Sequence, residues 1–344
     1  MPIVASRTHD EATTIAALVE LGRELMRQNY SWVCPSIETQ TLVNGRFTNR
    51  RALGLTDLFG WNRVGTFDTL ARQLPAGLIE SLCEAGVLQI TDGESVRSRV
   101  RFSSFADTLL AHSALPAHAD QDVVVGPDTQ RFGSFVAREL LGPSAPSASP
   151  TRPFTLVDLG CGSGAAGILA ARMWAAMAGE RPTRVLLIDQ NPRALRFSEV
   201  NARLANLSHF ECRRSDLLGA VTEPPLLVLA NPPGLINRQR RTSQHGGGEL
   251  GTGPAVRIVD ECLDRLLPGG TLMMCAVAPI VRGVDILLRS VEPRIMRTRA
   301  ARPATLRYQV LEVDVSAHQL ALPEYAEVDR LALVGLTVHV KAAN

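Results

Sequence analysis

The second half of the sequence alternates between two hydrophobic patterns. Short apolar runs typical of buried strands alternate with longer segments in which apolar residues recur every three to four positions, as in amphipathic helices. This alternation predicts an α/β domain with a mostly parallel, doubly wound sheet of seven strands that helices cover on both faces. The expected strands are 155–159, 184–188, 209–212, 226–230, 271–277, 307–314 and 331–340. The expected helices lie near 164–178, 192–206, 254–267 and 280–291.

The boundaries of this domain are also suggested by local pattern. Its last two expected strands have only a short connection, which favours an antiparallel hairpin at the edge of the sheet. Residues 120–141 contain an apolar run and then a helical pattern, so we expect them to supply a leading strand and helix. The segment 142–153 is rich in Pro, Ser and Ala and is typical of a surface loop or linker. We therefore assign residues 120–344 to one domain.

Residues 1–119 have a different pattern and are expected to form a smaller, mainly helical domain. An early helix carries one apolar face formed by Ile15, Leu18, Val19, Leu25 and Met26. A second helix begins at Pro75 and stops at Gly86. A strand, the turn TDGE and the alternating segment VRSRVRF follow, which predicts a hairpin. Helices followed by such a hairpin indicate a winged-helix-like unit.

Three arginines on the expected wing bear on what this unit binds. Arg97, Arg99 and Arg101 alternate, so we expect them on one solvated strand face. Winged helices often bind DNA, but the net charge of the whole chain is only +2, which gives no strong field for nucleic acid. A lid over a substrate or a dimerising surface is therefore preferred to a DNA reader, and a homodimer stays open.

Composition narrows the class of protein further. The 45% hydrophobic content is ordinary for a globular chain. None of the six cysteines forms a CxxC pair, which favours free thiols in a reducing compartment and predicts no metal site. No run of about 18 uncharged apolar residues and no apolar core of a signal peptide is present. We expect a soluble cytoplasmic protein.

A glycine-rich turn follows the first strand of the large domain. In the segment FTLVDLGCGSG, Asp158 ends the strand and Gly160, Gly162 and Gly164 permit positive φ and close approach of a ligand. A carboxylate just before the glycines suits a cationic amino-acid tail better than a pyrophosphate. This segment resembles motif I of class I S-adenosylmethionine (SAM)-dependent methyltransferases. The resemblance implies a Rossmann-like fold and SAM as the cofactor.

Two acids further along the chain extend this resemblance. Asp189 ends the second expected strand, where an acid commonly chelates ribose hydroxyls. Asp216 follows the third strand, where the resembling family usually has an acid that contacts the adenine amino group. Each acid alone is compatible with a helix cap or a loop charge. Together with the turn they support a SAM site.

The segment NPPG after the fourth strand indicates where chemistry takes place. It resembles the NPPY motif of methyltransferases that modify planar nitrogens such as adenine amino groups and glutamine side-chain amides. In that family the asparagine and a proline carbonyl accept hydrogen bonds from the target amine, so Asn231 and Pro232 are the expected catalytic residues, and Asn231 also borders the cofactor. The segment HGGGELGTG and a later PGG turn resemble the small-domain glutamine methyltransferases, and His245 is a candidate base or cover for the site.

Gly234 departs from this motif, because relatives carry Tyr or Phe at its position. An aromatic platform is worth roughly 1–3 kcal/mol of stacking for a base, and glycine supplies none of it. Either another ring replaces it or the reacting group is not planar. The candidates to face the substrate or the sulfonium are Tyr30, Trp32, Phe132 and Trp61.

Three functions remain open at this point. The first is methylation of a nitrogen in a small molecule or peptide. The second resembles the methyltransferase-like azetidine-2-carboxylate synthases, in which the α-amine of SAM itself attacks its γ carbon and methylthioadenosine leaves; this reaction needs no planar acceptor. The third is a SAM-responsive regulator that binds nucleic acid, which the nearly balanced charge makes the weakest.

Overall fold

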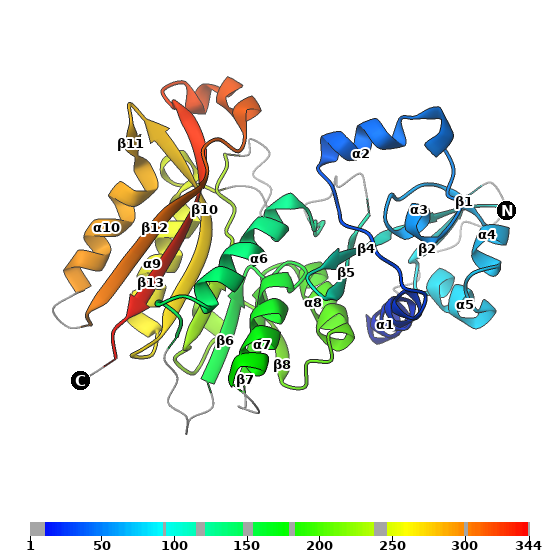
Figure 1. Cartoon of the computed structure of the whole chain (residues 1–344), viewed down its shortest axis with the longest axis horizontal. Coiled ribbons are helices and arrows are strands. Elements are labelled where there is room, and N and C mark those ends of the chain that lie inside the picture. Colours follow the sequence, from blue (N-terminus) through cyan, green and yellow to red (C-terminus); the bar gives the residue numbers. More distant parts are fainter. Residues whose placement is uncertain are drawn as a thin grey trace, which may run out of the picture. The chain divides into compact units, whose positions relative to one another are not determined.

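The computed structural model describes residues 11–91, 94–114, 121–146, 154–178, 183–236, 246–298 and 302–342 (Figure 1). The chain forms two compact units. The N-terminal unit comprises residues 1–130 together with 162–165 and 196–207. The C-terminal unit comprises 131–161, 166–195 and 208–344. Each unit is described by itself below.

The N-terminal unit combines short helices with two small antiparallel sheets. One sheet has the order β1-β3-β2 and the other pairs β4 with β5. The predicted hairpin is confirmed, since Leu88 pairs with Ser98 and Thr91 with Ser95. The predicted second helix is also confirmed, with Leu78, Ile79 and Leu82 buried along it. The elements are α1 (Glu11–Arg27), α2 (Ile37–Asn44), η1 (Phe47–Asn49), α3 (Leu55–Phe59), β1 (Gly65–Thr66), α4 (Phe67–Ala71), α5 (Ala76–Glu84), β2 (Leu88–Thr91), β3 (Ser95–Ser98), β4 (Val100–Phe105) and β5 (Thr108–Ser113).

The expected arginine face of the wing is wrong at Arg101. Arg97 and Arg99 are exposed, but Arg101 is 1% exposed and lies in a separate strand pair. Its guanidinium donates to the Gln40 side chain at 3.0 Å and to the Ser113 carbonyl at 3.2 Å. The alternation breaks because β3 ends at Ser98 and β4 starts at Val100, so the two segments do not share one sheet face.

The C-terminal unit contains the predicted doubly wound sheet. Its strand order is β12-β13-β10-β9-β6-β7-β8, and β11 pairs with β10, which gives eight strands among the described residues. The strands from β8 to β10 pair in parallel, whereas β13 is antiparallel to both β10 and β12. The expected antiparallel pair is thus confirmed, with β12 at the edge. The strands are β6 (Phe154–Leu159), β7 (Thr183–Asp189), β8 (Phe210–Arg214), β9 (Leu227–Ala230), β10 (Thr271–Val281), β11 (Val284–Asp285), β12 (Ala304–Glu312) and β13 (Arg330–Val340).

Helices cover both faces of this sheet, as strand alternation requires (Figure 1). The even-numbered positions of β13, such as Val334 and Val338, join a core with α9 and α10. The odd-numbered positions face the other way, where a Cβ on Gly335 would lie 2.4 Å from the ring of Phe135 on α6. The described helices that lie wholly or partly in this unit are α6 (Pro127–Leu140), α7 (Ala165–Ala178), α8 (Pro192–Leu204), α9 (Gly253–Arg265) and α10 (Ile286–Thr298), with short turns η2 (Leu217–Ala220), η3 (Glu249–Gly251), η4 (Ala317–Ala321) and η5 (Pro323–Tyr325).

Two local expectations for this unit are wrong. The described residues directly before α6 form no leading strand, because residues 122–126 are irregular. The helix expected near 280–291 begins later, at Ile286, since β10 continues to Val281. A tight turn with positive φ at Arg282 and Gly283 then leads into β11. Asp285 caps the helix by accepting the Leu288 N–H at 2.8 Å, and the helix continues through Pro293.

Candidate active site

The register of the parallel strands brings several predicted loops to one edge of the sheet. Leu159 at the end of β6 pairs with Ala230 of β9 on one side and with Ile188 of β7 on the other. The next residues along the three strands are Gly160, Asn231 and Asp189. This edge is the carboxyl end of the strands, and β6 and β9 flank the point where the strand order reverses. Ligands of doubly wound folds bind at this place.

The glycine-rich turn has the backbone conformation that its sequence predicts. Gly160, Gly162 and Gly164 have φ of +65°, +54° and +76°, a region that other residues adopt at a cost. Ser163 and Gly164 donate no backbone hydrogen bond to any described residue. The turn leads directly into α7, whose first N–H groups also point out of the helix end. The turn therefore presents several backbone donors, as an anionic ligand group requires.

Asp158 is a buried carboxylate directly beneath this turn. It is 2% exposed, and its Oδ2 accepts the Gly167 N–H in the first turn of α7 at 2.8 Å. Burial raises the pKa of Asp158 to about 7, and the negative charge of Asp189 adds to the effect. No described basic side chain forms an ion pair with it. A carboxylate that is costly to ionise gains most from a cationic ligand, which fits the ammonium group of SAM.

The two further acids are held in different ways. Asp189 accepts the Asn191 N–H at 2.9 Å, a local turn that keeps its carboxylate at the end of β7. Asp216 is half exposed, and its two oxygens accept from Gln190 at 2.8 Å and from Arg257 at 2.9 Å. Each carboxylate oxygen can accept a second hydrogen bond, so Asp216 can contact an adenine amino group without losing either partner.

Asn231 is available for a ligand. Its side chain is exposed and forms no hydrogen bond with any residue in the described part of the chain. Pro232 follows it with its carbonyl in the half-buried loop. The loop is anchored further on, where the Ile236 N–H donates to the Tyr325 hydroxyl at 2.7 Å and Leu235 accepts the Gly246 N–H at 2.7 Å. The anchored loop thus carries an amide that has no partner among the described residues.

Close packing explains why position 234 is glycine. A Cβ on Gly234 would lie 2.9 Å from Cβ of Val277 and 3.1 Å from its backbone nitrogen. On the other side, a Cβ on Gly251 would lie 2.4 Å from the Gly234 carbonyl oxygen. The glycine-rich segment after the loop therefore packs against it by backbone contact. The space that an aromatic ring would need is occupied by Val277.

This packing gives a prediction on stability. Gly234→Ala should lower the free energy of unfolding by roughly 1–3 kcal/mol, the usual cost of overpacking. Adding Val277→Ala should recover part of the loss, since it removes the side-chain atoms that the new methyl group meets. Urea unfolding of the single and double variants measures both effects. Gly126→Ala is the control, because a Cβ there meets nothing within 4 Å; equal stability of the two alanine variants would contradict the packing argument.

The candidate aromatic residues are held by contacts of their own. Within the N-terminal unit, the Tyr30 hydroxyl donates to the Phe102 carbonyl at 2.9 Å. Trp32 is buried and packs edge-on against Trp61, with ring centres 5.7 Å apart. Phe132 is buried on α6 in the C-terminal unit. Core packing accounts for all four rings, and the part played by any of them towards a ligand stays a prediction.

Three further features concern His245, metal-ligating clusters and membrane-spanning helices. His245 lies outside them, so its predicted role stays a prediction. The described residues contain no cluster of three metal-ligating side chains. Among the same residues, no helix has both the length and the apolar character needed to cross a membrane.

Several residues that contact the loops of the candidate site lie far from them in the sequence and were not predicted. Tyr325 and Val277 contact the NPP loop, residues 231–236, but lie far from it in the sequence. Nothing in the sequence around either residue indicates this role. Gly251 lies in the segment HGGGELGTG, and a glycine-rich segment of this kind indicates close approach of the backbone. The side chains of Ser198 and Asn201 on α8 donate hydrogen bonds to the glycine-rich turn. No local sequence pattern distinguishes these two from other buried polar residues.

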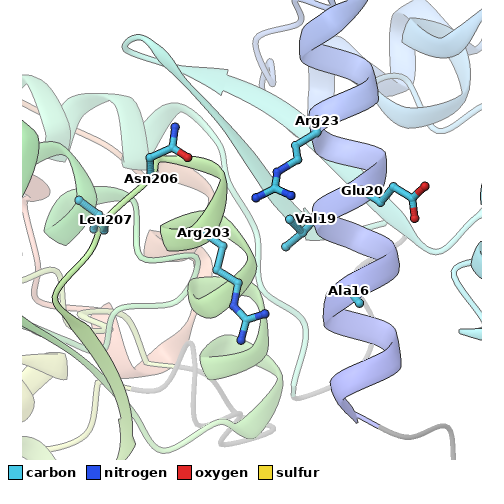
Figure 2. Close-up of a pocket in the computed structure, with 7 residues that line it drawn as sticks. All are labelled: Ala16, Val19, Glu20, Arg23, Arg203, Asn206 and Leu207. Carbon is cyan, nitrogen blue, oxygen red and sulfur yellow. The ribbon is translucent and has the colours of Figure 1, made fainter.

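A separate hollow lies in the N-terminal unit between α1 and the end of α8 (Figure 2). Its volume is about 650 Å³. Figure 2 shows Arg23 reaching towards α8, while Glu20 points to the other side of α1. Arg203 is tied to Glu199 by an ion pair of 2.5 Å. None of the predicted site residues lines this hollow, which is lined by Ala16, Val19, Glu20, Arg23, Arg203, Asn206 and Leu207.

Comparison with known families agrees with the geometry of the turn and the reaction loop. Residues 147–286 match the methyltransferase small domain. The matched stretch includes motif I, all three acids and NPPG. This match supports S-adenosylmethionine as the cofactor. No curated protein matches this sequence.

Several solved structures are matched at low identity and with TM-scores below 0.5. The tRNA m1G37 methyltransferase of M. jannaschii is 15% identical over 71% of this chain and 58% of that chain, with a TM-score of 0.43. Trm5b from Pyrococcus abyssi is 13% identical over 74% and 62%, with a TM-score of 0.46. A SAM-dependent methyltransferase from Agrobacterium tumefaciens is 17% identical over 72% and 71%, with a TM-score of 0.43. This chain covers less than two thirds of the length of the M. jannaschii and P. abyssi proteins.

Proposed function

We propose that this protein transfers the methyl group of SAM to a nitrogen of a small molecule or peptide. The observation that best supports the proposal is the pairing of Leu159 with Ala230, since the next residues are Gly160, which begins the glycine-rich turn, and Asn231 of the NPP segment. A ligand whose amino-acid tail lies on the turn then has its sulfonium within reach of whatever the loop holds. SAM supplies an electrophilic methyl group at that sulfonium.

The residues of this chain bind and orient both partners. Asp158 accepts the ammonium group of the cofactor, and Asp189 accepts its ribose hydroxyls. The Asn231 side-chain oxygen and the Pro232 carbonyl accept the two N–H groups of an acceptor amine. With both hydrogens held, the nitrogen lone pair points away from the loop and towards the methyl group, and this positioning is the main contribution to rate. As the N–C bond forms, the bond from the methyl carbon to sulfur breaks, S-adenosylhomocysteine leaves with the electron pair, and the nitrogen releases a proton to water.

One observation favours a second candidate, in which SAM is the whole substrate. Gly234 and Val277 leave no aromatic platform on this loop for a planar acceptor. In the alternative, the α-amine nitrogen of SAM attacks its own γ carbon while the bond from that carbon to sulfur breaks. Methylthioadenosine leaves with the electron pair, the new ammonium loses a proton, and azetidine-2-carboxylate forms. Asn231 and the Pro232 carbonyl would then hold the attacking amine.

Product analysis separates the two candidates. The full-length protein is incubated with SAM alone and with SAM plus a panel of amines, amides and peptides, and products are followed by mass spectrometry. Methyl transfer yields S-adenosylhomocysteine and a methylated acceptor, and only when an acceptor is present. Methylthioadenosine and a cyclic amino acid from SAM alone would replace the first proposal by the second. Failure to bind SAM in calorimetry would sink both.

A further inference from the structure

Two side chains of α8 donate hydrogen bonds to consecutive carbonyls of the glycine-rich turn. The Ser198 hydroxyl donates to the Gly162 carbonyl at 3.0 Å, and Nδ2 of Asn201 donates to the Ser163 carbonyl at 2.8 Å. Both side chains are completely buried, so these bonds are sheltered from water. The four residues belong to one compact unit of the chain. The turn is therefore anchored on the side that faces α8.

Peptide geometry converts this anchoring into an orientation of donors. A trans peptide is planar, and its C=O and N–H point in opposite directions. Since the Gly162 carbonyl points to α8, the N–H of Ser163 points away from it. The Ser163 carbonyl likewise directs the N–H of Gly164. Both N–H groups lack a partner among the described residues.

The orientation of the Asn201 amide is itself determined by backbone. Its Oδ1 accepts the Ala111 N–H at 2.7 Å, and its Nδ2 also donates to the Ala111 carbonyl at 3.0 Å. The amide cannot flip without placing its oxygen against two carbonyls and its nitrogen against an N–H. Both amide hydrogens and the oxygen are thus used, one hydrogen on the turn and the rest on β5. The Asn201 side chain therefore joins the β4–β5 hairpin to the glycine-rich turn through hydrogen bonds.

We infer that Ser198 and Asn201 are positioning residues that aim the Ser163 and Gly164 N–H groups at the carboxylate of the SAM amino-acid tail. The inference rests on the proposed use of SAM. Two adjacent backbone donors at the start of a helix favour an anionic group, and the anionic group of the SAM tail is its carboxylate. Asp158 at the base of the same turn suits the ammonium group, so the turn recognises both charges of the tail. Neither Ser198 nor Asn201 touches the cofactor.

Ligands that differ in the tail test this inference. SAM and S-adenosylhomocysteine carry the carboxylate, whereas methylthioadenosine lacks the whole amino-acid tail. Ser198→Ala removes one anchor without adding charge or bulk. It should raise the Kd of SAM and S-adenosylhomocysteine by about 3- to 10-fold, the usual effect of one lost hydrogen bond. The Kd of methylthioadenosine should change by less than about twofold.

The control is Ser290→Ala, because the Ser290 hydroxyl also donates to a backbone carbonyl, that of Ile286 at 2.9 Å, within another helix. Calorimetry on both variants decides the matter. Equal loss of all three ligands in Ser198→Ala would mean a merely structural role, and unchanged affinity for SAM would also overturn the inference. Absence of SAM binding by the wild-type protein would instead overturn the proposed function. Asn201→Asp should show the same selectivity more strongly, and Ser198→Ala decides alone if that variant does not fold.

Discussion

Asp158→Asn should weaken SAM binding by about 10- to 100-fold at pH 7.5, the effect of losing a hydrogen bond between charged groups. Asparagine keeps an oxygen for the Gly167 N–H, so the start of α7 should stay capped. What disappears is the negative charge that faces the ammonium group. Calorimetric titration with SAM measures the change. Asp264→Asn, which replaces an exposed acid on α9, is the control and should leave the affinity unaltered.

The same carboxylate should make SAM binding depend on pH. Burial raises the pKa of Asp158 to about 7, and an ammonium ligand selects the ionised form. The affinity of the wild-type protein should therefore fall as the pH drops below 7, approaching tenfold per pH unit. Asp158→Asn should lose this dependence between pH 5.5 and 7.5. A variant with the pH slope of the wild type would show that another group is responsible.

The effect of this carboxylate on folding has the opposite sign. Its pKa in the folded protein lies above the ordinary value of 3.8, so folding is favoured while the group is protonated. That contribution is complete below about pH 4 and is lost as the pH rises through 7. At pH 8 the ligand-free Asp158→Asn variant should therefore melt at a higher temperature than the wild type. The residue trades stability of the free protein for affinity, which melting with and without SAM can show directly.

Asn231→Ala should lower kcat about 100-fold or more, because misplacing the reacting nitrogen by an ångström has an effect of that size. Its side chain is exposed and bonds to no described residue, so the fold should be almost unchanged. Steady-state kinetics with the acceptor found by product analysis measures the loss. Gln89→Ala removes an exposed amide from β2 and is the matched control. A variant with normal kcat would mean that Asn231 does not hold the reacting amine.

The general architecture could be predicted from the sequence because it depends on regular patterns. Apolar strands such as 155–159 and 226–230 are buried on both faces, and this makes them continuous hydrophobic runs that stand out from their surroundings. The glycine turn and Asp158 were also predictable, since positive φ favours glycine and the carboxylate ends a strand. Those features are encoded by neighbouring residues.

The features that were missed depend on residues distant in sequence. Arg101 continues the alternation of Arg97 and Arg99, yet it turns inward because Gln40 and Ser113 provide acceptors for it. The late start of α10 depends on the turn at Arg282 and on the length of β13, which pairs with β10 as far as Ile280. Gly234 resembled a lost aromatic residue until Val277 was seen in its place. Tertiary contacts of this kind leave no periodic trace.

The backbone packing around the reaction loop has a consequence for attempts to change the acceptor by directed evolution. Gly246, Gly251 and Gly253 each approach other backbone atoms so closely that a Cβ would meet them at 3.2 Å or less. Mutant libraries at these positions, or at Gly234, should therefore contain mostly misfolded members. Diversity is better placed at Pro233, Leu235 and Ile236, which are half-buried and carry side chains already. The loop can be re-lined there while its glycine frame is kept.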